Sequence, residues 1–155
     1  MALDIGDTVP DFELPDQDGT PRRLSTLLED GPLVLFFYPA ALSGGCTKEA
    51  CSFRDLAAEY RKAGVQRAGI SRDLPAKQKK FAELNNFDYP LLSDPDYQVA
   101  EAMGVKRKLP LGPMSTRRMT FVIGTDRRVI EIIHDERSPE DHAARALDAL
   151  AAKKS

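Results

Sequence analysis

Apolar residues along the chain follow two patterns, which predict strands and helices in alternation. Continuous apolar runs that end at a proline or glycine are typical of strands buried on both faces. The clearest run covers residues 33–38 and is followed by Pro39. Further extended segments are predicted at residues 65–71, 90–92, 119–124 and 128–134. The last two flank a Gly-Thr-Asp turn, and residues 9–24 contain an Asp-Gly pair, so both regions predict β-hairpins.

Four other segments are predicted to be helices, the first from apolar residues at helical spacing and the other three from the residues at their ends. In the longest one, residues 46–62, these side chains share one face, and Gly64 is the expected C-terminal cap. The other three are residues 75–86, residues 96–103 and a C-terminal helix that opens at Ser138-Pro-Glu-Asp141. Helices in this order must cover both faces of a mixed central sheet. We therefore predict one domain over residues 1–155, with a thioredoxin-like α/β fold and an N-terminal β-hairpin.

The composition is that of a globular protein without a strongly charged partner. The chain has 155 residues, with 22 basic and 24 acidic residues and a formal net charge of −2, so we expect no nucleic-acid partner. No apolar run approaches the roughly 20 residues of a membrane span, so no membrane partner is expected. The start of the chain carries two acids and no basic group, unlike a signal peptide, and the expected location is the cytoplasm.

The chain has two cysteines, Cys46 and Cys51, which are five positions apart. In a reducing compartment such a close pair indicates catalysis or metal binding more than a structural disulfide. Cys46 lies where the predicted helix begins, and the unpaired N–H groups there stabilise a thiolate over a thiol. Three residues upstream, the Ser43 hydroxyl can both donate and accept a hydrogen bond. Gly44 and Gly45 would let a substrate approach the backbone closely.

The two cysteines cannot form a disulfide while both lie on one intact helix. Five residues rise about 7.5 Å and turn about 500° along an ideal helix, so the two sulfurs point in different directions. Their Cα atoms would then lie more than about 7 Å apart, which a disulfide cannot bridge. If the pair is joined at all, the first turns of the helix must unwind.

Three of these residues carry a resemblance to a known family. Pro39, Ser43 and Cys46 match the Pro-x-x-x-Thr/Ser-x-x-Cys signature of the peroxiredoxins. The run from Gly45 to Cys51 resembles the subgroup called PrxQ or bacterioferritin comigratory protein, in which the resolving cysteine follows the peroxidatic one by five residues. Further segments that look like this subgroup are Val9–Leu14, Phe53–Asp55, Tyr89–Asp94 and Arg118–Ile123.

The resemblance implies a thiol peroxidase that reduces hydrogen peroxide and organic hydroperoxides. Cys46 would attack the peroxide and become a sulfenic acid, and Cys51 would then close a disulfide onto it. A dithiol reductant, thioredoxin by family likeness, would reduce that disulfide by exchange. The resemblance implies no metal, haem or flavin cofactor. It favours a monomer and leaves a dimer open.

The family also has a site arginine, which precedes a late strand in the pattern Arg-x-Thr/Ser-Phe and here corresponds to Arg118. A guanidinium beside Cys46 would favour the thiolate and polarise the O–O bond of a hydroperoxide bound by Ser43. The adjacent Arg117 is expected to point to the opposite face of the strand. Glu49 matches an acid of the subgroup's motif, and we expect it to orient the arginine or to tune proton flow.

One departure from the subgroup concerns the loop before Cys46. The subgroup usually has Thr-Pro-Gly there, whereas this chain has Ser43-Gly44-Gly45. Serine keeps the hydroxyl but lacks the methyl group that limits rotation, and Gly44 removes a proline that would stiffen the loop. We therefore expect a looser reduced site that unwinds more readily.

Two other functions are compatible with parts of the pattern. The main alternative is a thioredoxin-like disulfide oxidoreductase, although such enzymes typically use a C-x-x-C pair. Hydrogen peroxide consumption measured against insulin reduction separates these two activities. The second alternative is a binding module that keeps the fold but has lost catalysis, and such a module would show no rapid loss of a thiol at low peroxide.

The sequence also contains weaker signals for zinc and for docking. The C-x4-C pair lies at the edge of zinc-ligand spacing, but His134 and His142 are eight positions apart, and we expect both to be solvated. Residues 106–118 hold five basic residues and no acid. This stretch favours a solvated loop, and docking of a reductase there stays an alternative.

Overall fold

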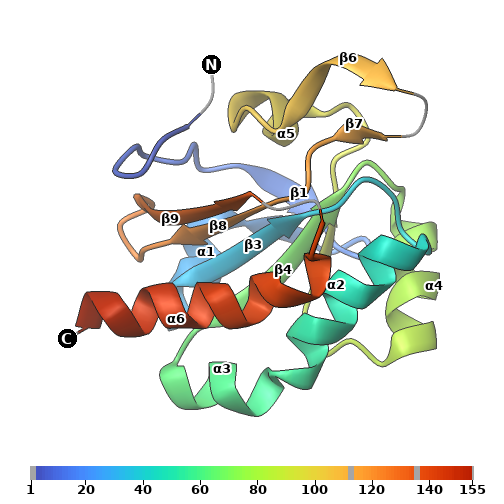
Figure 1. The fold of residues 1–155 in the computed structure, drawn as a ribbon. Coiled ribbons are helices and arrows are strands. Elements are labelled where there is room, and N and C mark those ends of the chain that lie inside the picture. Colours follow the sequence, from blue (N-terminus) through green and yellow to red (C-terminus); the bar gives the residue numbers. More distant parts are fainter. Residues whose placement is uncertain (1–2, 112–113, 135–136, 155) are drawn as a thin grey trace.

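A computed structural model describes residues 3–111, 114–134 and 137–154, and a mixed β-sheet forms its centre (Figure 1). The strands of this sheet are β3 (Leu33–Phe37), β4 (Gln66–Ser71), β5 (Leu91–Ser93), β8 (Met119–Ile123) and β9 (Val129–His134). Their order across the sheet is β5–β4–β3–β8–β9. β3, β4 and β5 run parallel, whereas β8 is antiparallel to both of its neighbours. The predicted mixed sheet is therefore confirmed.

Helices cover both faces of the sheet, as the sequence predicts (Figure 1). Residues 33–38 alternate between two hydrophobic cores, because successive side chains of a strand point to opposite faces. Val34 and Phe36 belong to one core, whereas Leu33 and Leu35 belong to the other. The first core lies under α2 (Gly44–Asp55), α3 (Ala57–Ala63), α4 (Pro75–Asn85) and α6 (His142–Lys154). The second lies under α1 (Leu24–Leu27) and α5 (Gln98–Ala102).

Two small antiparallel hairpins accompany the sheet. The predicted N-terminal hairpin is formed by β1 (Glu13–Pro15) and β2 (Pro21–Arg23). The other is formed by β6 (Lys106–Leu111) and β7 (Met114–Thr116), so the expected loop over residues 106–118 is wrong at residues 106–111 and 114–116. A row of basic residues does not prevent such pairing, because the ladder joins backbone groups. Residues 112–113 of that stretch lie outside the described residues.

The predicted helix over residues 46–62 is interrupted in the structure. It begins at residue 44, and Leu56 (φ −94°, ψ 20°) separates α2 from α3. Arg67 Nη1 donates a hydrogen bond of 2.7 Å to the Phe53 carbonyl, which competes with the helical N–H four residues later. Gly64 ends α3 in the left-handed conformation (φ 73°), in agreement with its predicted role as the cap.

The C-terminal helix begins later than the sequence signals indicate. A short 3-10 helix, η2 (Pro139–Asp141), precedes α6, so His142 becomes the first residue of α6. A second 3-10 helix, η1 (Leu28–Asp30), follows α1. Within the described ranges, no helix has both the length and the apolar character needed to cross a membrane.

Candidate active site

Cys46 lies beyond the end of the central strand, in the first turn of α2. β3 is followed by the buried Pro39, and a short loop leads from there to Ser43, which is the N-cap residue of α2. Cys46 is the third residue of that helix, and its side chain is fully buried. The first N–H groups of a helix lack helical partners, and the helix dipole is positive at this end. The position therefore stabilises a negative charge on the sulfur.

A buried carboxylate fixes the loop between β3 and α2. The Ala41 N–H and the Ser71 hydroxyl both donate to Asp73 Oδ2, at 2.6 and 2.7 Å respectively. Gln78 Nε2 donates to Ser71 Oγ at 3.0 Å, which joins α4 to the same network. Leu42 adopts a positive φ of 69° within this loop, a conformation that a bulky side chain rarely takes. The network therefore determines the path of the chain just before Cys46.

Arg118 reaches Cys46 from the neighbouring strand. It immediately precedes β8, whose antiparallel pairing with β3 sets Thr120 opposite Phe36. Arg118 Nη2 lies 3.5 Å from Cys46 Sγ, and the arginine side chain is only 7% exposed. Gly45 leaves room for this approach, because a Cβ on that residue would stand 3.1 Å from Arg118 Nη2. The sulfur is thus in contact with a guanidinium that is almost withdrawn from water.

Glu49 lies on the same face of α2 and binds the same guanidinium. Its Oε1 accepts a hydrogen bond of 3.1 Å from Arg118 Nη1, and the carboxyl group is fully buried. Burial raises the pKa of Glu49 to about 8, against the opposing effect of Arg118. Burial by itself would lower the pKa of Arg118, but Glu49 and Cys46 beside it raise that pKa above its ordinary value. Burial therefore favours the protonated form of Glu49 beside a charged guanidinium.

His142 also belongs to this cluster, and the prediction for its side chain was wrong. We expected it to be solvated, but its side chain is fully buried at the start of α6. His142 Nδ1 lies 3.3 Å from Glu49 Oε2 and 2.7 Å from Thr120 Oγ1. The sequence contained a signal for this burial, because Ala146 and Leu150 follow His142 at steps of four and share its helix face.

Ser43 and Cys51 have other neighbours. Ser43 is exposed, and its hydroxyl donates to the Ala40 carbonyl at 3.0 Å. Cys51 is half-buried, and its Sγ lies 3.7 Å from Asn85 Oδ1 of α4. Burial raises the pKa of Cys51, and the nearby Arg54 offsets this effect only in part. Both cysteines are free thiols on an intact α2. Of the predicted site residues, the structure therefore brings together Cys46, Glu49 and Arg118.

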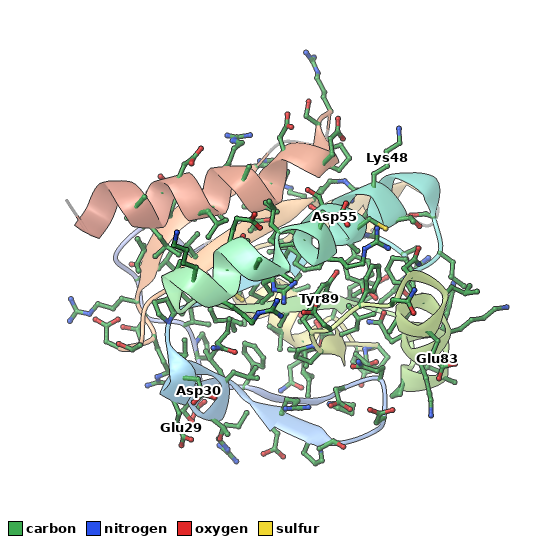
Figure 2. All side chains as sticks on the ribbon, turned by 90° about the horizontal axis from the view of Figure 1, so that it is seen from below. Glu29, Asp30, Lys48, Asp55, Glu83 and Tyr89 are labelled. Carbon is green, nitrogen blue, oxygen red and sulfur yellow. The ribbon has the colours of Figure 1, made fainter. Side chains whose placement is uncertain are left out.

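The second half of α2 is anchored from its inner side. The Tyr89 hydroxyl donates to the Ala50 carbonyl, and Arg67 Nη1 donates to the Phe53 carbonyl, each at 2.7 Å. Figure 2 shows Tyr89 inside the molecule beneath the helices, whereas Lys48 points away from it. These two hydrogen bonds tie the end of α2 to β4 and to the segment before β5. The first turn, which carries Cys46, lies outside this anchored part.

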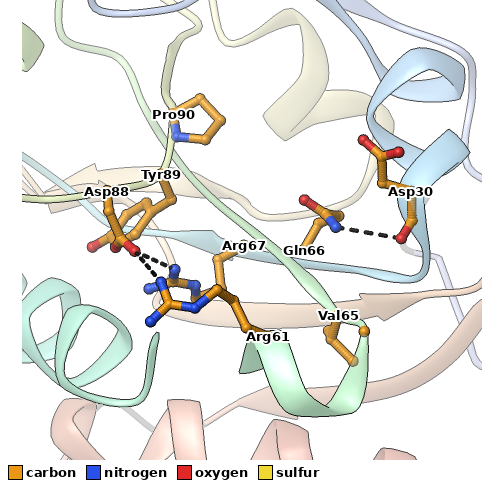
Figure 3. Close-up of a pocket in the computed structure, with 9 residues that line it drawn as sticks. Asp30, Arg61, Val65, Gln66, Arg67, Asp88, Tyr89 and Pro90 are labelled. Carbon is orange, nitrogen blue, oxygen red and sulfur yellow. Dashed lines mark hydrogen bonds and ion pairs between the residues drawn. The ribbon is translucent and has the colours of Figure 1, made fainter. Parts of the chain in front are cut away.

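A pocket of about 440 Å³ opens beside these anchors (Figure 3). Arg61 and Arg67 both point to Asp88 in this pocket, with nitrogen–oxygen distances of 3.7 and 2.8 Å. The guanidinium of Arg67 also lies over the rings of Tyr60 and Tyr89. The residues that line the pocket include none of the predicted site residues, and its arginines are paired with its own carboxylate. We therefore place the candidate active site at Cys46 and not in this pocket.

The arrangement around Cys46 suits a reaction in which a thiolate attacks an electrophilic atom and a leaving group departs with negative charge. The helix N-terminus and Arg118 both favour the thiolate, which is the nucleophilic form of cysteine. The same guanidinium can stabilise the charge that develops on a leaving oxygen. In the part of the chain that the structure describes, no group of three or more metal-ligating side chains is placed to hold a metal ion.

Comparison with known proteins identifies the class that this fold and this site define. The family model described as AhpC/TSA family matches residues 5–132. The chain is also 39% identical over 143 residues to peroxiredoxin Bcp of Escherichia coli K12, a match that covers 90% of this chain and 91% of that protein. The chain therefore belongs to the AhpC/TSA family.

Two solved structures refine this assignment within the family. The structure of peroxidoxin BcpB from Mycobacterium tuberculosis superposes with a TM-score of 0.93 at 59% identity, over 99% of both chains. That of the bacterioferritin comigratory protein of Xanthomonas campestris, which was studied for its alkyl peroxide reduction activity, gives a TM-score of 0.88 at 28% identity, over 98% of this chain and 100% of that one. The resemblance to peroxiredoxins of the PrxQ or bacterioferritin comigratory protein subgroup is thus confirmed, together with the thioredoxin-like fold and the peroxidase class of enzyme.

Proposed function

We propose that Cys46 is the peroxidatic cysteine and Cys51 the resolving cysteine of a thiol peroxidase that reduces hydrogen peroxide and organic hydroperoxides. The observation that carries the proposal is the 3.5 Å contact between Arg118 Nη2 and Cys46 Sγ at the N-terminus of α2. Two sources of positive charge act there on one sulfur and favour its thiolate form. Residues 1–155 act as one catalytic domain in this proposal, because β3, α2 and β8 together position the reacting groups.

In the first step, the Cys46 thiolate attacks the terminal oxygen of the hydroperoxide, and the O–O bond breaks. The sulfur is oxidised to a sulfenic acid, while the departing oxygen takes up a proton and leaves as water or an alcohol. Arg118 stabilises the negative charge on that departing oxygen. We assign to the Ser43 hydroxyl the binding of the peroxide, in exchange for its hydrogen bond to the Ala40 carbonyl. The buried Pro39 sets the direction of the loop.

In the second step, the Cys51 sulfur attacks the sulfenic sulfur, and the disulfide forms with release of water. Five residues of intact helix separate the two cysteines by a rise of about 7.5 Å, so the first turns of α2 must unwind. Gly44 and Gly45 weaken this part of the helix, because glycine is a poor helix former. Burial keeps the pKa of Cys51 above its ordinary value, so unwinding also exposes this thiol and makes it easier to ionise.

In the third step, a dithiol protein reduces the disulfide by thiol–disulfide exchange and regenerates both thiols. We infer thioredoxin as this dithiol from the family likeness. The cycle then requires a reducing compartment, which supports the cytoplasm as its location. We also propose a monomer as the active form, by likeness to the subgroup. Sedimentation of the reduced protein would distinguish this monomer from a dimer.

The Cys46→Ser variant tests the assignment of the peroxidatic cysteine. With one equivalent of hydrogen peroxide, wild-type protein should lose the Cys46 thiol first and then the Cys51 thiol as the disulfide forms, whereas the remaining thiol of Cys46→Ser should not react rapidly. Rapid alkylation followed by mass spectrometry measures the loss of each thiol. A Cys46→Ser protein that still turns over peroxide would refute the proposal. Wild-type protein that reduces insulin but leaves peroxide untouched would favour a disulfide oxidoreductase.

The Cys51→Ser variant tests the resolving step separately. Its Cys46 should react with peroxide as fast as in the wild type, because Cys51 does not contribute to the first step. The product should then stop at a sulfenic acid, which dimedone traps and mass spectrometry identifies. Turnover with thioredoxin should fall. Formation of an intramolecular disulfide is impossible in this variant, so unchanged thioredoxin-dependent turnover would contradict the resolving role.

A further inference from the structure

The carboxyl group of Glu49 contacts a second ionisable side chain on the side away from Arg118. Its Oε1 binds Arg118, but its Oε2 is buried without a hydrogen bond of ordinary geometry to any residue that the structure describes. His142 Nδ1 lies 3.3 Å from this Oε2. Thr120 Oγ1 lies 2.7 Å from the same ring nitrogen, and this hydrogen bond fixes the orientation of the imidazole beside the carboxyl group. All three residues that meet here, Glu49, Thr120 and His142, are fully buried.

One proton held by either member of this pair would leave the pair without net charge. The proton can sit on the carboxyl group beside a neutral imidazole, or on the imidazole beside a carboxylate, and the sum is zero in both cases. Without that proton, the Glu49 carboxylate would compete with the Cys46 sulfur for the charge of Arg118. Arg118 contacts both groups, at 3.1 Å through Nη1 and 3.5 Å through Nη2, so this competition is direct.

We propose that His142 is a positioning residue of the peroxidatic site, which shares one proton with Glu49 and so reserves the charge of Arg118 for the Cys46 thiolate. The inference rests on the proposed function of Cys46. No bond to the substrate is involved, and the shared proton stays within the pair during the reaction. Thr120 contributes by fixing the orientation of the imidazole. The raised pKa of Glu49, which burial causes, agrees with a proton that is retained at neutral pH.

Other ionisable groups around the pair come from several elements. Arg118 approaches from the start of β8, and Cys46 lies on the same turn of α2. Tyr89, which precedes β5, is close enough for Glu49 to raise its pKa further, although burial is the main cause of that shift. The acids of η2, Glu140 and Asp141, are exposed. A pH effect on Cys46 must therefore be assigned by substitution of the pair itself.

The His142→Asn variant provides the main test. Asparagine places a polar atom near the position of Nδ1 and can still bind Thr120, but it cannot carry the proton. The rate of Cys46 oxidation by hydrogen peroxide is measured by rapid alkylation and mass spectrometry, from about pH 6 to about pH 10. The rate should fall on the alkaline side at least about one pH unit earlier than in the wild type, with a loss of about tenfold near pH 9.

Two further variants distinguish an effect of His142 that acts through Glu49 from a purely structural effect of His142. In a Glu49→Gln background the neighbour of His142 cannot ionise, so the added His142→Asn change should no longer alter the shape of the pH profile. His134→Asn replaces the other histidine of the chain, which is exposed on β9, and should keep the wild-type profile. An equal loss of rate at every pH, an unchanged profile in His142→Asn, or a pH effect that persists beside Gln at position 49 would each overturn the inference.

A measurement on the wild-type protein covers the case in which His142→Asn does not fold. NMR signals of the His142 ring and of the Glu49 carboxyl carbon should titrate together, because interacting groups lose protons in shared steps. Independent titrations of the two groups would contradict a shared proton. The outcome is distinct from failure of the proposed function, which a wild-type Cys46 unreactive towards peroxide would show. A reactive Cys46 with independent titrations would refute only the role of His142.

Discussion

Gly45 decides how closely the guanidinium of Arg118 approaches the peroxidatic sulfur. A Cβ at this position would stand 3.1 Å from Arg118 Nη2, and the arginine cannot yield freely because Glu49 holds its other nitrogen. We expect Gly45→Ala to slow the oxidation of Cys46 by hydrogen peroxide about tenfold, which corresponds to roughly 1.4 kcal/mol of lost transition-state stabilisation. Rapid alkylation and mass spectrometry measure this rate.

Gly44→Ala is the matched control for that substitution. A Cβ on Gly44 meets no atom within 4 Å, although the residue lies in the same helical turn. Gly44→Ala should gain up to about 1 kcal/mol of helix stability, because alanine is a better helix former than glycine, whereas the close contact with Arg118 should offset this gain in Gly45→Ala. Only Gly45→Ala should slow the oxidation of Cys46. If both variants react at the wild-type rate, the contact with Arg118 is not what makes Cys46 reactive.

The buried carboxyl group of Glu49 should make the stability of the protein depend on pH. Its pKa rises from 4.5 to about 8 on folding, so the folded protein binds this proton more tightly than the unfolded chain. The resulting stabilisation is fully present below about pH 4.5 and is lost as the pH rises towards 8. Over this range the free energy of unfolding of the wild type should decrease by a few kcal/mol relative to Glu49→Gln, whose amide does not titrate. Urea unfolding at a series of pH values measures the difference, and parallel pH curves would contradict it.

Individual site residues differ in how far the sequence could predict them. Cys46 and Glu49 lie within one helical segment, so the sequence predicts that they are close to each other. Arg118 was predicted from a family pattern. His142 could have been placed inside from its apolar helix face, but its contact with Glu49 joins residues that are far apart in the chain. The hydrogen bond between Cys51 and Asn85 also joins residues that are far apart in the chain, because it depends on the packing of α4 beside α2.

At the scale of the elements, the hydrogen bond from Tyr89 to the Ala50 carbonyl should control how easily α2 unwinds. Tyr89→Phe removes this bond and keeps the ring, so the protein should lose about 1 kcal/mol of stability. Because α2 must open before Cys51 can reach the sulfenic acid, disulfide formation should become several-fold faster. Mass spectrometry of samples quenched after one equivalent of peroxide follows the disulfide over time.

Tyr60→Phe is the control for this prediction. The Tyr60 hydroxyl also donates to a buried carbonyl, that of Ala143 in α6, at 2.8 Å. Its loss should cost a similar amount of stability but leave α2 anchored, so the rate of disulfide formation should not change. A similar acceleration in both variants would mean that general loosening of the fold, and not release of α2, sets the rate of the second step.

The elements that the sequence predicted best are those with strong local periodicity. β3 follows from an apolar run, and α4 follows from the predicted helix between Pro75 and Asn86; in the structure Asn86 caps α4 in the left-handed conformation. The interruption of the long helix at Leu56 was not predictable in this way. It coincides with a hydrogen bond from Arg67, on β4, to a carbonyl of α2, and such a contact exists only in the folded molecule.

At the scale of the whole molecule, the reduced active site should keep its arrangement, apart from brief local opening of the first turns of α2, until the complete fold unfolds. Cys46, Arg118 and His142 come from α2, the start of β8 and α6, and these elements share one core with β3. We expect a single cooperative transition in urea, in which far-UV circular dichroism and the peroxide reactivity of Cys46 change at the same midpoint. Loss of reactivity well before the loss of circular dichroism would show that the site opens independently of the rest.

The antiparallel pairing of β3 with β8 also limits where the chain can change in length. Phe36 stands opposite Thr120, so the C-terminal end of β3 and the start of β8 lie side by side at the same end of the sheet's strands. Inserting or deleting one residue within β8 would shift Arg118 by about 3.3 Å and turn it to the other face of the sheet. Insertions in the turn between β8 and β9 lie at the opposite end of the strands and leave this alignment intact. Length variation among functional descendants of this chain should therefore collect at that turn and avoid the strand itself.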